Sequence, residues 1–187
     1  GCRLGIDSHA DMSCIGRHAR IMETYEGKQC TVYPFNDTLA SMKNIETVNA
    51  AFAFDGDEGR VFILNVNQAL NFSDTMEHSL LCPNQARING VVVDDIQPHL
   101  DYHQRTTHSV WIPERDISLP LDLHGPISYL RVRYPNEEDL DFGEYVDLTS
   151  PDDWEPSSVD FTARGEYNVS SISSALDQTI DYEFPNM

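Results

Sequence analysis

The strongest constraint on the fold of this chain is a pair of strand-like runs joined by a short loop that contains two glycines. The runs, 45–54 and 60–66, are rich in Val, Ile, Phe and Ala. They flank the five residues Asp55, Gly56, Asp57, Glu58 and Gly59. β-forming runs on either side of a glycine-containing loop of this length are typical of a β-hairpin. The sequence therefore predicts a hairpin over 45–66 and a mainly β fold.

A second informative stretch, 4–13, lies near the start of the chain. Leu4 and Ile6 alternate with Arg3 and Gly5 at the period of a β-strand. Asp7 and Ser8 follow at once, and side chains of these types hydrogen-bond to the backbone of a turn. We therefore expect a strand that delivers an acidic side chain into a tight turn.

Further along the chain, a short helix is predicted between two buried strands. Pro83 suits the first helical position and Gly90 the position just after the helix, so the flanking runs 79–81 and 91–93 become the strands. Three more short strands are predicted at 109–113, 117–123 and 127–134.

The length and the distribution of charge suggest one main domain with additions. The 187 residues suffice for one ordinary core and a small appendage. From residue 137 to the end, the sequence contains fourteen acidic residues and one basic residue, Arg164. We expect a domain over 1–97, a β-rich appendage over 98–150 and a disordered acidic tail over 151–187, because the tail has too few apolar residues to offset its ordering entropy.

Composition also narrows the possible functions. The formal net charge of −19 argues against nucleic-acid binding, which requires clustered Lys and Arg. No apolar run approaches the length of a membrane span, and the four cysteines contain no C-x-x-C pair. We expect a cytoplasmic protein, cut from a longer polyprotein, that uses no cofactor and contacts neither nucleic acid nor membrane.

Two segments resemble the retropepsin-like aspartic protease domain of copia-type retrotransposon polyproteins. The run Ile6-Asp7-Ser8-His9-Ala10-Asp11 is similar to the family element in which an apolar strand ends in Asp-Ser-Gly-Ala. Segment 70–85 is similar to the part in which an apolar strand, a turn and a Leu-Leu pair precede a helix. The resemblance covers roughly residues 2 to 97. It implies a closed β-barrel with one short helix, in which the hairpin over 45–66 is the flap and 55–59 its tip.

The resemblance also implies a mechanism. Aspartic proteases need two carboxylates that share one proton. One Asp-Ser-x-Ala element supplies one of them, so the chain is expected to act as a homodimer on a polypeptide substrate, with Asp7 of each copy in the site. Ser8 would brace the two loops, and His9, Ala10 and Asp11 would support Asp7. His9 stands where the family has Gly, and Cys82-Pro83 where many members have Gly.

A non-catalytic module with the same fold is the alternative. If the first strand continued to Asp11, the side chains of Asp7, His9 and Asp11 would share one face and could bind a metal ion. The His9 ring could equally hydrogen-bond to Asp7 and hold that carboxylate ionised, which opposes proton sharing. Ser8, His9 and Asp11 are too close in sequence to form a hydrolase triad.

Overall fold

The computed structural model describes residues 1–34, 36 and 38–157. Residues Gly1–Pro156 form one compact unit. Of the predicted acidic tail, 158–187 lie outside the described residues. Residues 151–156, in contrast, belong to the compact unit, so the predicted start of the tail at 151 is too early.

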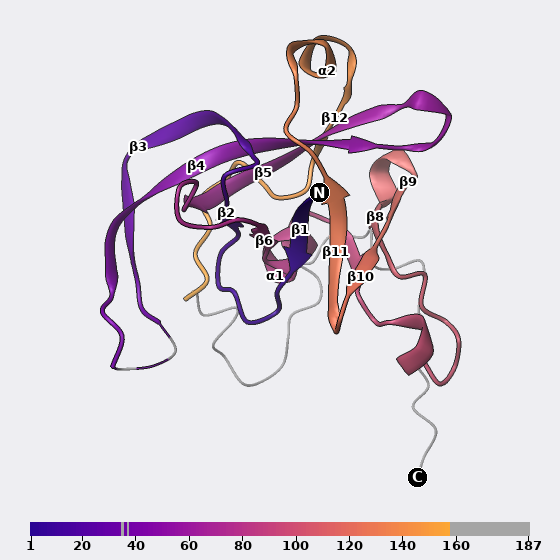
Figure 1. Ribbon diagram of the computed structural model, residues 1–187, viewed down its shortest axis with the longest axis horizontal. Helices are drawn as coiled ribbons and strands as arrows, with labels where there is room; N and C mark the ends of the chain where they lie inside the picture. The colour runs from indigo at the N-terminus through magenta and orange to yellow at the C-terminus, as the bar shows by residue number, and fades with distance from the viewer. Residues whose placement is uncertain (35, 37, 158–187) are drawn as a thin grey trace. The chain divides into compact units, whose positions relative to one another are not determined.

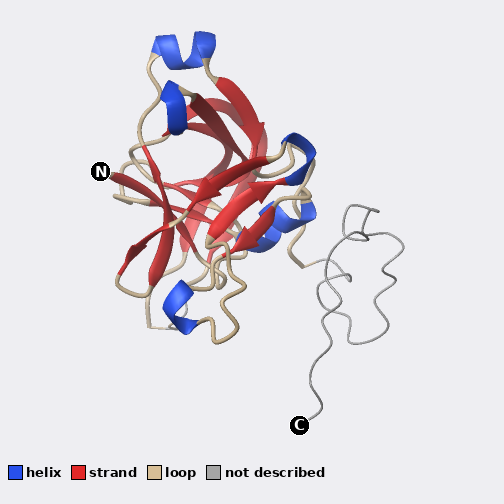
Figure 2. Ribbon diagram, turned by 90° about the vertical axis from the view of Figure 1, so that its right-hand side faces the viewer, coloured by secondary structure: helices blue, strands red, loops and turns tan. Residues whose placement is uncertain are grey.

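The protein is mainly β, as predicted, with short helices between the strands (Figure 2). The strands are β1 (Cys2–Ile6), β2 (Cys14–Ile15), β3 (Arg20–Val32), β4 (Met42–Asp55), β5 (Val61–Asn71), β6 (Ser79–Leu81), β7 (Val92–Asp94), β8 (Ser109–Ile112), β9 (Ile117–Pro120), β10 (Asp122–His124), β11 (Ile127–Val132) and β12 (Glu144–Asp147). The α-helices are α1 (Pro83–Ile88) and α2 (Glu137–Phe142), and 3-10 turns cover Asp57–Gly59, Pro98–Leu100 and Pro113–Arg115. Within the described residues, none of the helices has the length and apolar character needed to cross a membrane.

The large sheet has the strand order β10-β11-β1-β6-β2-β5-β4-β3, and β12 pairs with β5 beside this path. β6 lies between β1 and β2, parallel to β1 and antiparallel to β2. The chain therefore leaves the sheet at the end of β1, turns, and returns as β2 with another strand between the two. Asp7 lies at the start of that turn.

The hairpin predicted over 45–66 is confirmed. β4 and β5 pair antiparallel from Thr47 opposite Leu70 to Asp55 opposite Val61. β3 pairs with the other edge of β4 and forms a second long hairpin with it (Figure 1).

The predicted closed barrel is not confirmed, because the described strands form an open path from β10 to β3. An isolated bridge between Ala53 and Arg133 brings the chain just after β11 against β4. The two residues exchange backbone hydrogen bonds of 2.9 Å each. The sheet therefore curls until β4 meets the chain after β11, but this isolated bridge does not pair the two as neighbouring strands.

Residues 98–150 do not form a separate appendage, which corrects the predicted boundary at 97/98. β11 pairs antiparallel with β1, and β12 pairs parallel with β5. Strands from this region thus complete the sheet that carries the first hundred residues. The smaller sheet, β7-β8-β9, also spans the predicted boundary, since β7 precedes it.

The predicted helix is confirmed as α1, with Pro83 in its first turn and Gly90 at φ +79° just beyond its end. α2 was not predicted, so the fold has more than the one short helix expected. A capping box begins α2: the Asn136 side chain accepts from the Asp139 N–H, and the Asp139 carboxylate accepts from the Asn136 N–H.

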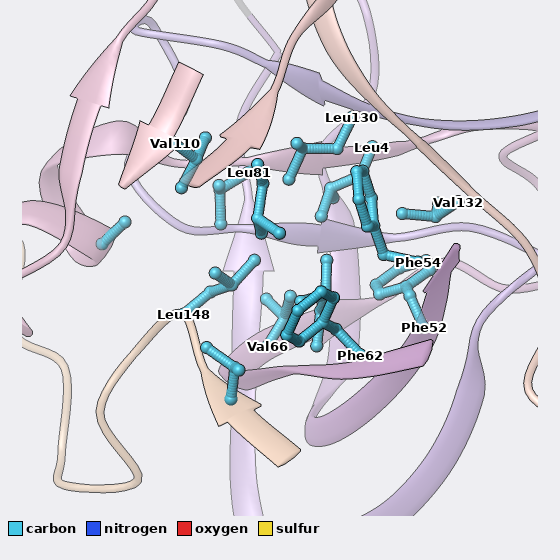
Figure 3. Packing of buried hydrophobic residues seen from close by; sticks show 14 of the residues in the cluster. Leu4, Phe52, Phe54, Phe62, Val66, Leu81, Val110, Leu130, Val132 and Leu148 are labelled. Atoms are coloured by element: carbon cyan, nitrogen blue, oxygen red, sulfur yellow. The ribbon is translucent and has the colours of Figure 1, made fainter. Parts of the chain in front are cut away.

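The main core lies between the curled parts of the large sheet and the smaller sheet. Phe52, Phe62 and Val66 of the hairpin face Leu4, Leu81 and Leu130 from the β1 region (Figure 3); this apolar packing also includes Phe54, Val110, Val132 and Leu148. Leu4 is fully buried in β1. Burial of β1 and β6 therefore fixes the point at which Asp7 leaves the sheet.

Candidate functional site

The candidate site is the Asp7 loop, residues 7–13, between β1 and β2. Its first residue is still tied to the sheet, because the Asp7 N–H donates to the Leu81 carbonyl at 3.1 Å. Asp7 itself is half-buried, and Ser8 and His9 are exposed. The parallel pairing of β1 with β6 thus delivers an accessible carboxylate at the end of a buried strand.

A tight turn follows the carboxylate. The His9 N–H donates to Asp7 Oδ1 at 2.9 Å, and the Ala10 N–H donates to the Asp7 carbonyl at 3.3 Å. The His9 N–H is thus fixed against the Asp7 carboxylate. This donor comes from the main chain at position 9, so any residue with an N–H supplies it. The His9 ring contacts Ser8 instead, with Nδ1 3.5 Å from the Ser8 hydroxyl.

The turn does not require glycine at position 9. His9 is not among the described residues with a positive φ, the backbone region in which glycine is favoured. A histidine at position 9 therefore strains no backbone in this chain. Its effect is to add an exposed imidazole beside Asp7.

A buried hydrogen-bond network fixes the far end of the loop. Gln85 Oε1 accepts from the Ser13 N–H at 3.0 Å and from the Ser13 hydroxyl at 2.9 Å. The Ser13 hydroxyl accepts from the Cys82 N–H at 3.0 Å. Gln85 Nε2 donates to the carbonyls of Asn67 and Gln68 at 3.1 and 2.9 Å. One buried amide therefore links the loop to α1 and β5.

An apolar cluster supports the outer side of the loop. It contains the buried residues Met12, Leu70, Phe72, Cys82 and Trp154 and the partly buried Cys14, Cys30, Val32, Ile45 and Met76, and we call it the second cluster. The Trp154 indole N–H donates to the Asp11 carbonyl at 2.7 Å. A residue from the predicted tail thus contacts the middle of the loop.

The cysteine nearest the loop is not a nucleophile. Burial raises the pKa of the Cys14 thiol to about 11, and the negative charge of Asp7 adds to this shift. Only the thiolate is strongly nucleophilic, and it is scarce at neutral pH when the pKa is this high. Of the two groups, the Asp7 carboxylate is the one available for chemistry.

The alternative metal site is not formed. Residues 8 and 9 are in a turn, so the side chains of Asp7, His9 and Asp11 do not alternate along one strand as the metal prediction required. Among the described residues, no group of three His, Cys, Asp or Glu side chains is arranged to hold a metal ion.

The loop predicted as the tip of the flap lies away from Asp7. β5 meets Ser13 at Leu70, whose N–H donates to the Ser13 carbonyl at 2.9 Å, but the loop 55–59 begins at the other end of the strand. Nine residues of an extended strand span roughly 30 Å. Asp55 instead accepts hydrogen bonds from Arg133. The structure therefore does not bring 55–59 and Asp7 together.

Searches with this chain found no relative. Neither the protein-family models, nor the curated proteins, nor the solved structures contain a match to it.

Sequence reasoning identified Asp7 and its turn but missed the groups that hold them. The roles of Ser13 and Gln85 were not predicted, although a polar side chain at the third position of a short helix between two buried strands can signal a buried contact. Trp154 falls in the predicted disordered tail, because the apolar residues around it are too sparse to predict a folded segment. A large aromatic residue in such a segment was the signal that it packs against the fold.

Proposed function

We propose that this chain is an aspartic endopeptidase that processes a retrotransposon polyprotein and acts as a homodimer, with one Asp7 from each copy in the active site. The observation that supports this most is the position of Asp7. It is an accessible carboxylate, at the end of a buried strand, that accepts a backbone N–H from the following turn. The resemblance of 6–11 and 70–85 to copia-type proteases points to the same residue.

The proposed chemistry requires two such carboxylates. Like charges about 3 Å apart do not both ionise, so the two Asp7 side chains share one proton. The ionised carboxylate takes a proton from water as the water attacks the scissile carbonyl carbon. The protonated one hydrogen-bonds to the carbonyl oxygen, whose charge increases. The resulting tetrahedral intermediate then collapses: the C–N bond breaks, and the leaving amine takes the proton that the first carboxylate had accepted from water. The pair of carboxyl groups is thereby left with one shared proton.

The chain supplies half of this arrangement. It has one Asp-Ser-x-Ala element, so the second carboxylate comes from a second copy. The exposed Ser8 hydroxyl is the group proposed to brace one loop against the other. A closed retropepsin-like barrel belongs to the same proposal. The Ala53–Arg133 bridge, where the sheet already meets itself, is the place at which the barrel would close.

We assign the covering role of the flap to the β3–β4 hairpin rather than to 55–59. Val32 and Ile45 of this hairpin pack in the second cluster beside Met12 of the Asp7 loop. Towards its tip the hairpin exposes large apolar side chains, with Tyr33 79% and Leu39 55% exposed. Exposed apolar groups gathered on one element indicate a contact surface, and an extended peptide lying over Asp7 would cover it.

The first test is cleavage of an oligopeptide library at pH 4 to 6. Asp7→Asn is expected to lower kcat/KM by at least roughly 10²–10⁴-fold, the usual loss when a general acid or base is removed. Asp141→Asn is the matched control, because it makes the same change in an exposed residue of α2, outside the Asp7 loop. We expect the control to retain activity. Cleavage by Asp7→Asn, or none by a verified wild-type dimer, supports the non-catalytic module instead.

The second test addresses the dimer. Wild-type protein mixed with an excess of Asp7→Asn forms mixed dimers that carry one carboxylate. If the site needs both copies, activity falls as the excess grows, in proportion to the loss of wild-type dimers. An excess of Asp141→Asn leaves activity intact. Activity that does not change with added Asp7→Asn would refute a shared site.

A further inference from the structure

Residues 148–154 form a segment without regular secondary structure, which we call the strap, that follows β12 and contacts the end of β5. The Leu148 N–H donates to the Asn65 carbonyl at 2.9 Å. Thr149 Oγ1 accepts from the Asn67 N–H at 2.7 Å and donates to the Asn67 carbonyl at 2.8 Å. Asn67 Nδ2 in turn donates to the Thr149 carbonyl at 2.7 Å. The start of the strap is thus fixed to the sheet without any contribution from the Asp7 loop.

The strap continues toward the loop through two further contacts. Gln68 Nε2 donates to the Pro151 carbonyl at 3.1 Å, and Lys28 of β3 forms an ion pair with Asp153 at 2.9 Å. Trp154 follows directly, with 9% of its side chain exposed. Its ring packs in the second cluster with Met12, and its N–H donates to the Asp11 carbonyl. The strap therefore ends on the loop.

Trp154 contacts the middle of the Asp7 loop, between the two ends that other groups hold. One end of the loop is held by the hydrogen bond from Asp7 to Leu81, and the other by Gln85 at Ser13. Asp11 and Met12 lie between these anchors, next to the turn that aims a backbone N–H at Asp7. Trp154 fixes both residues at once, one through a hydrogen bond and the other through apolar packing.

We propose that Trp154 is a positioning residue for the Asp7 loop, and that the strap is part of the functional unit. The effect on catalysis rests on the proposed protease activity. The effect on the conformation of the loop does not. Trp154 acts through the loop and touches no reacting group, so its loss is expected to change turnover more than substrate binding.

The test compares Trp154→Phe with Trp111→Phe. The first keeps an aromatic ring but removes the N–H, and the second makes the same change in β8 of the smaller sheet. Loss of one hydrogen bond corresponds to roughly a fivefold change. Trp154→Phe is expected to speed amide hydrogen exchange in a peptide covering residues 9–13 about fivefold, with no change in one covering 61–66. We also expect kcat to fall about fivefold and KM to stay the same. Trp111→Phe changes none of these.

The outcomes separate the two proposals. If the wild type cleaves nothing but Trp154→Phe still speeds exchange at 9–13, the protease proposal fails and the positioning of the loop stands. If the wild type cleaves and Trp154→Phe changes neither exchange nor kcat, the role of Trp154 is refuted. A second check uses the wild type and does not depend on a variant that folds. The proposal requires the Trp154 indole N–H to exchange slowly with solvent, because the side chain is buried and its N–H is hydrogen-bonded to Asp11. Rapid exchange there also refutes the proposal.

Discussion

Replacing Gln85 by Met tests how the Asp7 loop is held. Met has nearly the same volume, so the change leaves no cavity and removes only the polar contacts. The Ser13 N–H loses its acceptor, and the Gln68 carbonyl loses this donor. The Asn67 carbonyl keeps the Thr149 hydroxyl, and the Ser13 hydroxyl keeps the Cys82 N–H. The Ser13 N–H and the Gln68 carbonyl are therefore the two buried groups whose hydrogen bonding suffers most.

The size of the effect follows from these two groups. A buried donor or acceptor without a partner costs about 1–3 kcal/mol, so we expect Gln85→Met to lower the free energy of unfolding by about 3 kcal/mol. For a domain of this size, that corresponds to a fall of roughly 6–12 °C in Tm. Thermal and urea unfolding, followed by tryptophan fluorescence, measure it. The matched control is Gln29→Met on an exposed position of β3, where we expect less than about 0.5 kcal/mol.

A second variant gives the pH dependence. In Gln85→Glu, one oxygen keeps the bonds to Ser13 while the other faces two carbonyl oxygens. Burial and these oxygens raise the pKa of the new carboxyl above its unfolded value of about 4.3. The protonated acid can donate to a carbonyl, so the variant is least destabilised below pH 4 and loses stability as pH rises through the raised folded pKa. A loss below about 1 kcal/mol in Gln85→Met, or a pH-independent Gln85→Glu, would refute the role of the amide.

Two further predictions concern stability. The hydrogen bonds from Arg133 hold the pKa of Asp139 below its ordinary value, so this carboxylate stabilises the fold above the unfolded pKa of about 4 and stops doing so as pH falls through the lowered folded pKa. Asp139→Asn should therefore lower Tm at pH 7 and differ little from the wild type near pH 2; an equal loss at both would contradict this. A Cβ on Gly16 would lie 2.7 Å from the Met76 carbonyl oxygen, whereas one on Gly5 would meet ordinary contacts of 3.5 Å or more. Gly16→Ala should thus lower the free energy of unfolding, measured in urea, by about 1–3 kcal/mol, and Gly5→Ala should lower it much less. Equal losses in the two variants would contradict this, because they would mean that the backbone around Gly16 shifts to make room for the Cβ.

Local patterns predicted the elements that carry their own signals. The β4–β5 hairpin follows from β-forming runs around a loop with two glycines, and α1 from Pro83 and Gly90. Only the end of β3 carries such a signal, in the alternation of Cys30 and Val32. Over 20–27 most side chains are exposed and no apolar alternation marks the strand. The capping box of α2 was present in the sequence at Asn136 and Asp139, but the general acidity of the region hid it.

The site was predictable only in part, for a different physical reason. Asp7 and its turn depend on neighbouring residues, so a short stretch of sequence identifies them. The groups that hold the loop come from far along the chain: Gln85 bonds to Ser13 across 72 positions, and Trp154 bonds to Asp11 across 143. No local pattern specifies such pairs. The assignment of the flap to 55–59 had the same weakness, since position in sequence did not indicate which end of β5 lies near Asp7.

The hydrogen bond between Trp154 and Asp11 also determines when, during synthesis, the Asp7 loop can reach its final conformation. The chain is made from its N-terminus at about 5–20 residues per second, so Asp11 leaves the ribosome roughly 7–30 seconds before Trp154. A contact of such high sequence separation must also close a long loop, at an entropic cost, before it stabilises anything. The Asp7 loop therefore takes its final form only after β12 and the strap have been synthesised. A nascent chain would carry the acidic residue long before it carried the finished site.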